Sequence, residues 1–301
     1  MNKYPLLLTA IPKTALWGGR KLNRYYENCP YDKFSELWVL SVRTEDQCVI
    51  RNGEYAGKTL REYLETDAPF PLLIKFIDAA DKLSVQVHPD DALAALDGDQ
   101  GKTEMWYIME AEEGAELIYG LKEGKTAADF KAAVAAGDVD SVLHHQPVKA
   151  GETYFIPAGM IHGIGAGILV AEIQQNSDLT YRVYDYDRVG PDGKKRPLHV
   201  EKSMEAAKEF TPEAVRALQF EAGNEGIVNC CYFKVEEKQG GFCGNAERFE
   251  VLMITEGCGT IEAQGEEYPL QAGECCYLPA GMGDYTVSGA LKLLLVKENT
   301  L

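Results

Sequence analysis

Hydrophobic and polar residues alternate in short runs along most of this chain, and glycine, proline, aspartate and asparagine separate the runs. Alternation over roughly four to eight residues is typical of half-buried β-strands, and the separating residues favour turns. The pattern therefore predicts a mainly β protein of sandwich or barrel type. The clearest predicted strands span residues 36–40, 82–88, 105–109, 117–120, 152–156, 168–174 and 249–254.

Only a few segments carry apolar residues at helical spacing. Residues 58–65 and 200–210 are two of them, and residues 126–143 give the strongest pattern. In that third segment the apolar positions are Phe130, Ala133, Val134, Val139 and Val142. Because it lies between two predicted strands, we interpret it as a small helical insertion, near residues 126–145, within a β-domain.

An internal repeat relates two distant parts of the chain. Residues 149–160 align with residues 271–282, and each copy contains Ala-Gly-Glu, a short apolar run and Pro-Ala-Gly-Met. Such self-similarity predicts two related β-domains, which we place at residues 1–215 and 216–301, joined by a linker near residues 210–226. The second copy has Asp284 where the first has His162 and contains no histidine, so we interpret it as a degenerate domain without a metal.

Composition narrows the classes of function. The 301 residues carry a formal net charge of −17, which argues against nonspecific nucleic-acid binding and against anionic membrane surfaces. No apolar run approaches the roughly 20 residues of a membrane span, and no signal-peptide pattern is evident. Eight cysteines include two adjacent pairs and no Cys-x-x-Cys, which favours reduced thiols in the cytoplasm over disulfides or a thiolate zinc site.

Residues 151–162 form the most informative motif, with the spacing Gly-x5-Pro-x-Gly-x2-His. Gly151 closes a turn, residues 153–156 form a strand, and Pro157 and Gly159 break it. His162 then enters the next strand, where alternation can point its imidazole inward. This spacing resembles the second signature of the cupin double-stranded β-helix, in which the terminal histidine binds a metal.

Three further residues are candidate partners of His162. Gln86 and His88 are two positions apart in a predicted strand and so face the same side, and Glu104 begins another strand. Nitrogen and oxygen donors without a thiolate fit catalytic Zn²⁺, although ligand type alone leaves Mn²⁺, Fe²⁺ and Co²⁺ open. The rival pair, His144 and His145, follows the predicted insertion and is interpreted as a solvated helix end.

Other charged residues lie near these candidate ligands in the sequence. Lys75 interrupts an apolar run, where a lysine is either an edge residue or a functional cation. The polar, aromatic segment 172–188 contains Arg182, which can hold a phosphate or stabilise developing negative charge. From the residues alone, a surface loop of salt bridges explains this segment equally well. His199 has no ligand-like spacing and is interpreted as structural.

Taken together, these motifs resemble the type I mannose-6-phosphate isomerase family in its short bacterial form. The resemblance is carried by Trp17-Gly18-Gly19, Glu36-Leu37-Trp38, Gln86-Val87-His88-Pro89, Gly101-Lys102-Thr103-Glu104, the 151–162 motif and the 172–188 segment. It implies two cupin-type jelly-roll domains. It also implies one Zn²⁺ per chain with the ligands Gln86, His88, Glu104 and His162. Arg182 matches the family's catalytic arginine, and Lys75, Lys102, Glu172 and Asp178 resemble residues of its pocket.

The implied activity is a metal-dependent interconversion of mannose 6-phosphate and fructose 6-phosphate through an enediol. We expect Arg182 to stabilise charge while Lys75, Lys102 or Asp178 assists proton transfer, and the identity of the base stays open. The partner is a small phosphosugar. Two alternatives belong to other classes: a cupin oxygenase, which would need Fe²⁺ and consume oxygen, and a non-catalytic sugar-binding cupin. The Gln-x-His pair and Arg182 argue against the first, and the intact ligand set argues against the second.

Overall fold

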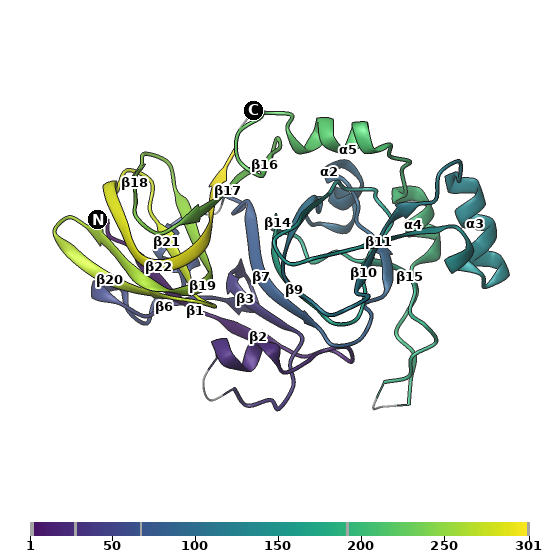
Figure 1. Ribbon diagram of the computed structural model, residues 1–301, viewed down its shortest axis with the longest axis horizontal. Coiled ribbons are helices and arrows are strands. Elements are labelled where there is room, and N and C mark those ends of the chain that lie inside the picture. The colour runs from purple at the N-terminus through teal and green to yellow at the C-terminus, as the bar shows by residue number, and fades with distance from the viewer. Residues whose placement is uncertain (1–2, 27–28, 67, 191–192, 300–301) are drawn as a thin grey trace.

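Two β-sheets face each other in the first unit of the protein, and a nine-stranded sheet forms the second unit beside it (Figure 1). The computed structural model describes residues 3–26, 29–66, 68–190 and 193–299. The six-stranded sheet of the first unit has the order β12 (Thr153–Ile156), β9 (Glu104–Ala111), β14 (Ile168–Gln175), β7 (Leu72–Ala79), β3 (Glu36–Leu40), β2 (Ile11–Lys13). The facing five-stranded sheet has the order β11 (Leu143–Pro147), β10 (Glu116–Leu121), β13 (His162–Ile164), β8 (Val85–Val87), β15 (Tyr181–Tyr184).

The second unit draws strands from both ends of the chain. Its order is β16 (Val228–Asn229), β17 (Phe233–Gln239), β22 (Gly283–Glu298), β19 (Glu250–Ala263), β21 (Cys275–Leu278), β1 (Leu6–Thr9), β6 (Val49–Ile50). Two further strands pair at its edges, β18 (Phe242–Ala246) with β22 and β20 (Glu266–Gln271) with β19. A separate short hairpin joins β4 (Val42–Arg43) and β5 (Asp46–Gln47). The mainly β architecture with few helices confirms the predicted fold class.

All seven predicted strands are present, as β3, β8, β9, β10, β12, β14 and β19. The strand predicted at residues 82–88 is shorter, because β8 covers only Val85–Val87. The strand predicted at residues 249–254 is longer, because β19 continues to Ala263. The division into residues 1–215 and 216–301 stays a prediction, and the pairing of Leu7 in β1 with Cys276 in β21 ties the two parts together.

Helices are short and lie outside the sheets: α1 (Leu60–Leu64), α2 (Asp91–Ala94), α3 (Ala127–Ala136), α4 (Val200–Ala206) and α5 (Pro212–Gln219). The insertion predicted at residues 126–143 begins where expected, since Thr126 forms a capping box with Asp129. It ends earlier than predicted, because Gly137 adopts the left-handed conformation that terminates α3. A 3₁₀ turn, Val139–Ser141, then leads into β11.

The predicted repeat is present in three dimensions. The strand β12 of the first copy and β21 of the second contain equivalent residues, and the turns around them have matching hydrogen bonds. The Met160 N–H donates to the Pro157 carbonyl at 3.0 Å, and the Met282 N–H donates to the Pro279 carbonyl at 3.0 Å. The glycines at the start of each copy also form matching hydrogen bonds. The Gly151 N–H donates to the Ile108 carbonyl, and the Gly273 N–H donates to the Ile254 carbonyl. The repeat therefore encodes the same strand and turn twice.

The first part of β19 is buried on both faces of the second unit's sheet. In β19, Val251 and Met253 join the large core shared with the first unit, whereas Leu252 and Ile254 belong to the core inside the second unit. This division follows the two-residue period of a strand. No helix in the described ranges is long and apolar enough to cross a bilayer.

Candidate active site

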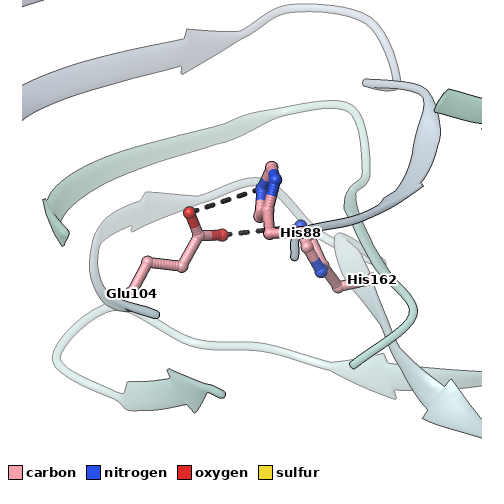
Figure 2. A group of neighbouring side chains, drawn as sticks. All are labelled: His88, Glu104 and His162. Carbon is pink, nitrogen blue, oxygen red and sulfur yellow. Dashed lines mark ion pairs between the residues drawn. The ribbon is translucent and has the colours of Figure 1, made fainter. Parts of the chain in front are cut away.

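Three predicted metal ligands come together between the two sheets of the first unit. His88 directly follows β8, His162 begins β13 and Glu104 begins β9 on the facing sheet. The Glu104 carboxylate lies between the imidazoles, with Oε2 3.6 Å from His88 Nε2 and Oε1 3.5 Å from His162 Nε2 (Figure 2). One ligand atom from each residue lies within 4.8 Å of the others, and all three residues are buried. This spacing suits ligands of one metal ion.

Backbone carbonyls fix both imidazoles in the form that a metal needs. His88 Nδ1 lies 2.7 Å from the Leu179 carbonyl, and His162 Nδ1 lies 2.8 Å from the Met160 carbonyl. A carbonyl only accepts, so each Nδ1 carries the proton and each Nε2 keeps a lone pair directed toward Glu104. Burial also lowers the pKa of both rings, that of His162 to about 4, which keeps them neutral.

The carboxylate of Glu104 supports the same interpretation. Burial raises its pKa to about 7, although Lys102 opposes the shift. Its Oε2 accepts from Lys102 Nζ at 2.7 Å, but its Oε1 has no hydrogen-bond donor among the described residues. A buried carboxylate oxygen without a donor is costly, and a bound cation would satisfy it. The three residues therefore fit a metal ion.

Gln86, the fourth predicted ligand, lies beside the group. It pairs with His162 across β8 and β13, and its Nε2 lies 3.3 Å from the His162 Nε2. Gln86 is partly exposed and lines the adjacent pocket, unlike the three buried residues. Its part in metal binding stays a prediction.

Cross-strand pairing explains how the remaining site residues are positioned. In the five-stranded sheet, Gln86 pairs with His162 on one side and with Arg182 on the other. In the six-stranded sheet, Glu172 pairs with Lys75 on one side and with Trp106 on the other. Residues directly opposite each other in a ladder share a face of the sheet. Each sheet thus contributes one row of polar side chains to the space between them.

A pocket of about 320 Å³ lies in this space. It brings together all of the predicted catalytic residues and adds two that the sequence analysis did not select as site residues, Glu36 and Arg196. Glu36 belongs to the Glu-Leu-Trp motif, and Arg196 ends a basic run at residues 194–196 that the sequence analysis did not use. The charged and amide residues of the pocket are Glu36, Lys75, Gln86, Lys102, Glu172, Asp178, Arg182 and Arg196.

Lys75 is a buried cation of this pocket and not an edge residue. Its Nζ lies 2.9 Å from Glu172 Oε2 and 3.3 Å from Glu36 Oε2. Burial disfavours the charged amine, but the two carboxylates outweigh burial and raise the pKa of Lys75. Burial would likewise raise the pKa of Glu172, but Lys75 and Lys102 lower it to about 2. At neutral pH the site therefore holds a fixed ion pair.

Indole groups and a second lysine complete the polar arrangement. Trp106 Nε1–H donates to Glu172 at 2.7 Å, and Trp38 Nε1–H donates to Glu36 at 2.6 Å. Lys102 Nζ lies 2.9 Å from His88 Nε2 as well as close to Glu104. These contacts hold the carboxylates in one orientation, so the site is organised before a substrate enters.

Arg182 is half-buried, and neighbouring backbone fixes its position. Its Nη1 donates to the Pro197 carbonyl at 3.0 Å, while its Nε is buried without an acceptor among the described residues. Burial lowers the pKa of Arg182, and the nearby guanidinium of Arg196 lowers it further. His199 has a structural role, as predicted: its Nδ1 accepts from the Arg182 backbone N–H at 3.2 Å.

The rival histidine pair lies elsewhere. His144 and His145 belong to strand β11, so the prediction of a helix end was wrong; the helix had already stopped at Gly137. His144 is exposed, and His145 contacts Glu116 at 2.5 Å and an aspartate at 2.9 Å. Neither belongs to the metal-ligand group formed by the described residues.

Comparisons with known proteins agree with this geometry. The family model for the type I phosphomannose isomerase catalytic domain matches residues 6–133, and the model for the mannose-6-phosphate isomerase cupin domain matches residues 232–298. The mannose-6-phosphate isomerase of Streptococcus mutans is 37% identical over 98% of this chain and 98% of its own length. ManA of Bacillus subtilis, a mannose-6-phosphate isomerase, is 35% identical over 96% of this chain and 97% of its own length.

Solved structures show the same fold. The crystal structure of the mannose 6-phosphate isomerase from Bacillus subtilis has a TM-score of 0.87 and 32% identity, covering 97% of this chain and 99% of that one. A zinc-bound mannose 6-phosphate isomerase shares the fold at 15% identity, with a TM-score of 0.72 over 99% of this chain and 100% of that one. The chain belongs to the type I mannose-6-phosphate isomerase family, with its mainly β cupin fold, and is an isomerase.

Proposed function

We propose that the pocket between the two sheets of the first unit interconverts mannose 6-phosphate and fructose 6-phosphate with the help of one Zn²⁺. The observation that carries the proposal is the buried group of His88, Glu104 and His162 directly behind Gln86 and Lys102, which line the pocket. Such an arrangement lets a sugar in the pocket reach both a metal and charged side chains. The cupin oxygenase and the non-catalytic sugar-binding cupin have no comparable support.

The donor set favours zinc among the metals that the ligand types allow. We propose that His88, Glu104, His162 and Gln86 bind it, because two imidazoles, a carboxylate and an amide oxygen leave room for substrate. The zinc in the structurally similar isomerase supports this choice. When bound, the ion would polarise sugar oxygens and stabilise negative charge on the enediol.

Within the chain itself, charge stabilisation falls to Arg182 and Lys75. The reaction moves a proton between C2 and C1, and negative charge develops on the adjacent oxygens. Arg182 has a buried N–H without an acceptor, and the raised pKa of Lys75 keeps its amine protonated. Both are thus fixed positive charges in a partly desolvated pocket, where they stabilise an anionic intermediate more strongly than water does.

The base is better sought among the other candidates. A protonated Lys75 cannot accept a proton, and Glu172, with a pKa of about 2, is too weakly basic to be efficient near neutral pH. We propose Lys102, acting in its neutral amine form and buried 2.7 Å from Glu104, with the exposed Asp178 as the alternative. Turnover in D₂O separates them: Lys102→Met should abolish solvent exchange of the transferred hydrogen, while Asp178→Asn should preserve it. The opposite result would assign the role to Asp178.

We further propose that residues 1–215 form the catalytic unit and residues 216–301 a degenerate cupin domain without its own metal. His88, Glu104 and His162 all belong to the first range, and the second contains no histidine. Eight free thiols support a reducing compartment, and we propose the cytoplasm.

The test is a coupled assay of fructose 6-phosphate formation from mannose 6-phosphate, before and after EDTA and with Zn²⁺ added back. Metal content is measured on the same samples. Loss of turnover with EDTA and recovery with zinc are expected. Full turnover after verified metal removal would contradict the metal mechanism, and no turnover with metal bound would contradict the isomerase proposal.

A further inference from the structure

Two arginines pair with one buried carboxylate beside the pocket, and a third arginine lies near them. Asp185 accepts from Arg196 through Nε at 2.8 Å and Nη2 at 2.5 Å, and from Arg188 Nη2 at 2.5 Å. Arg182 is close enough for both other guanidinium groups to lower its pKa. This positive cluster stands out in a chain with a net charge of −17. Like charges gathered around a single carboxylate favour binding of a further anion.

The three arginines differ in how fully they are paired. Arg188 also donates to the Lys82 carbonyl and lies 3.7 Å from Asp81, so protein groups surround it. Arg196 pairs, within the described residues, with Asp185 alone, and it lines the pocket together with Arg182. Arg196 therefore has N–H groups left for a molecule in the pocket, in addition to those of Arg182, which is assigned to the reacting end of the substrate.

Asp185 joins the two ends of one segment. Residues 185–190 and 193–197 extend away from the first unit after β15 (Figure 1), and Val189 and Lys195 pair across the segment. Asp185 lies at its start and Arg196 near its end, so their ion pair closes the base. The side chain of Asp185 is only 6% exposed, whereas that of Arg196 is 27% exposed. A buried, bidentate carboxylate fixes the direction of a guanidinium far better than an exposed one does.

We propose that Arg196 binds the phosphate end of the substrate and thereby distinguishes phosphorylated from free sugars, and that Asp185 is the positioning residue that aims it. The proposal rests on the proposed function, in which the substrate is a phosphosugar. The reacting end of the sugar lies toward the metal ligands, Lys102 and Arg182, and the phosphate end lies toward Arg196. Loss of either member of the Asp185–Arg196 pair weakens binding without removing the reacting groups.

Two variants test the pair: Arg196→Ala removes the binding group, and Asp185→Asn removes the group that aims it. Both should raise KM for mannose 6-phosphate about tenfold or more, as expected for loss of a hydrogen bond between charged groups, with kcat changed less than about threefold. Arg196→Lys should recover part of the loss. Zinc content should match the parent protein in every variant.

Asp187→Asn is the matched control. Asp187 lies on the same segment but pairs with Lys195, and both side chains are exposed. Its φ is +55°, a conformation that asparagine tolerates well, so the backbone is preserved. This variant should retain the parent KM. Calorimetric titration of the zinc-loaded protein with inorganic phosphate gives a readout independent of turnover.

Weaker phosphate binding by Arg196→Ala and Asp185→Asn, but not by Asp187→Asn, would support the proposal even if the parent protein failed to turn over mannose 6-phosphate. KM and phosphate affinity within twofold of the parent in Arg196→Ala would overturn it. An Asp185→Asn defect in kcat alone, with KM unchanged, would overturn the positioning role. Thermal unfolding of each variant separates these results from loss of the fold.

Discussion

Glu104 and Glu250 occupy the same position in the two units. Glu104 pairs with Ile156, the last residue of β12, and Glu250 pairs with Leu278, the last residue of the repeated strand β21. In the first unit the carboxylate faces two imidazoles. In the second, it accepts from the Tyr285 hydroxyl at 2.5 Å and pairs with Lys297 at 2.6 Å. The position of the candidate metal ligand Glu104 thus has a structural counterpart in which protein groups pair with the carboxylate.

We therefore predict that Glu250→Gln lowers stability without affecting the metal. The variant weakens the buried contacts to Tyr285 and Lys297, and the free energy of unfolding should fall by about 1–3 kcal/mol in a denaturant titration. Zinc content and kcat/KM should remain those of the parent. Loss of zinc from this variant would show that the two units are not separate in function.

Zinc affinity should depend on pH through Glu104. Its pKa is about 7, and the metal needs the carboxylate, so below pH 7 a proton must leave before the ion binds. His162, with a pKa of about 4, is already neutral there. Competition with a chelator of known pH dependence should show affinity falling roughly tenfold per pH unit between about pH 7 and 5. Glu104→Gln should bind weakly and lose this slope, and a flat profile in the parent would contradict the assignment.

Replacing Lys75 should be costly for stability. Lys75→Met leaves Glu172 buried without its cation, which typically costs about 3–5 kcal/mol. Chemical denaturation should show this loss at pH 7. The double variant Lys75→Met/Glu172→Gln should recover part of it, because the uncompensated charge is gone. An equally unstable double variant would mean that packing around Lys75, and not its ion pair, supports the fold.

Arg182 should matter for turnover far more than for metal binding. Arg182→Ala removes a fixed charge from the pocket and should lower kcat by about 10²–10³-fold, with zinc content unchanged. Arg216→Ala removes an arginine from an exposed position on α5 and serves as the control, which should keep the kcat and zinc content of the parent. Steady-state kinetics with metal analysis decides the matter: normal turnover of Arg182→Ala would rule out its proposed role.

Local signals in the sequence were sufficient for much of the fold and the site. The two-residue period located the strands, and the spacing from Gly151 to His162 located a metal ligand, because turn residues and alternation act over short distances. The capping residue Thr126 marked the start of α3, but the apolar pattern continued past Gly137 and hid its end. Residues 210–226, predicted as a linker, contain α5, which begins with a Thr211 cap and Pro212.

What the sequence could not reveal depends on contacts between distant segments. The direction of Lys75 follows from its pairing with Glu172, which lies on another strand. Arg196 enters the pocket because Asp185 binds it from the other end of an extended segment. Neither relationship has a local periodicity, so composition and spacing alone leave both residues ambiguous.

The position of β1 also has a consequence for biosynthesis. This strand lies between β21 and β6, and one of these two partners, β21, is translated long after β1. On the ribosome, β1 must remain unpaired with β21 while the metal-binding sheets are already complete in sequence. Closing such a long loop is slow relative to local pairing, and an unpaired apolar strand is prone to aggregate. Joining of β1 to β21 therefore cannot precede synthesis of β21, and until then the β21 edge of β1 must be protected in another way.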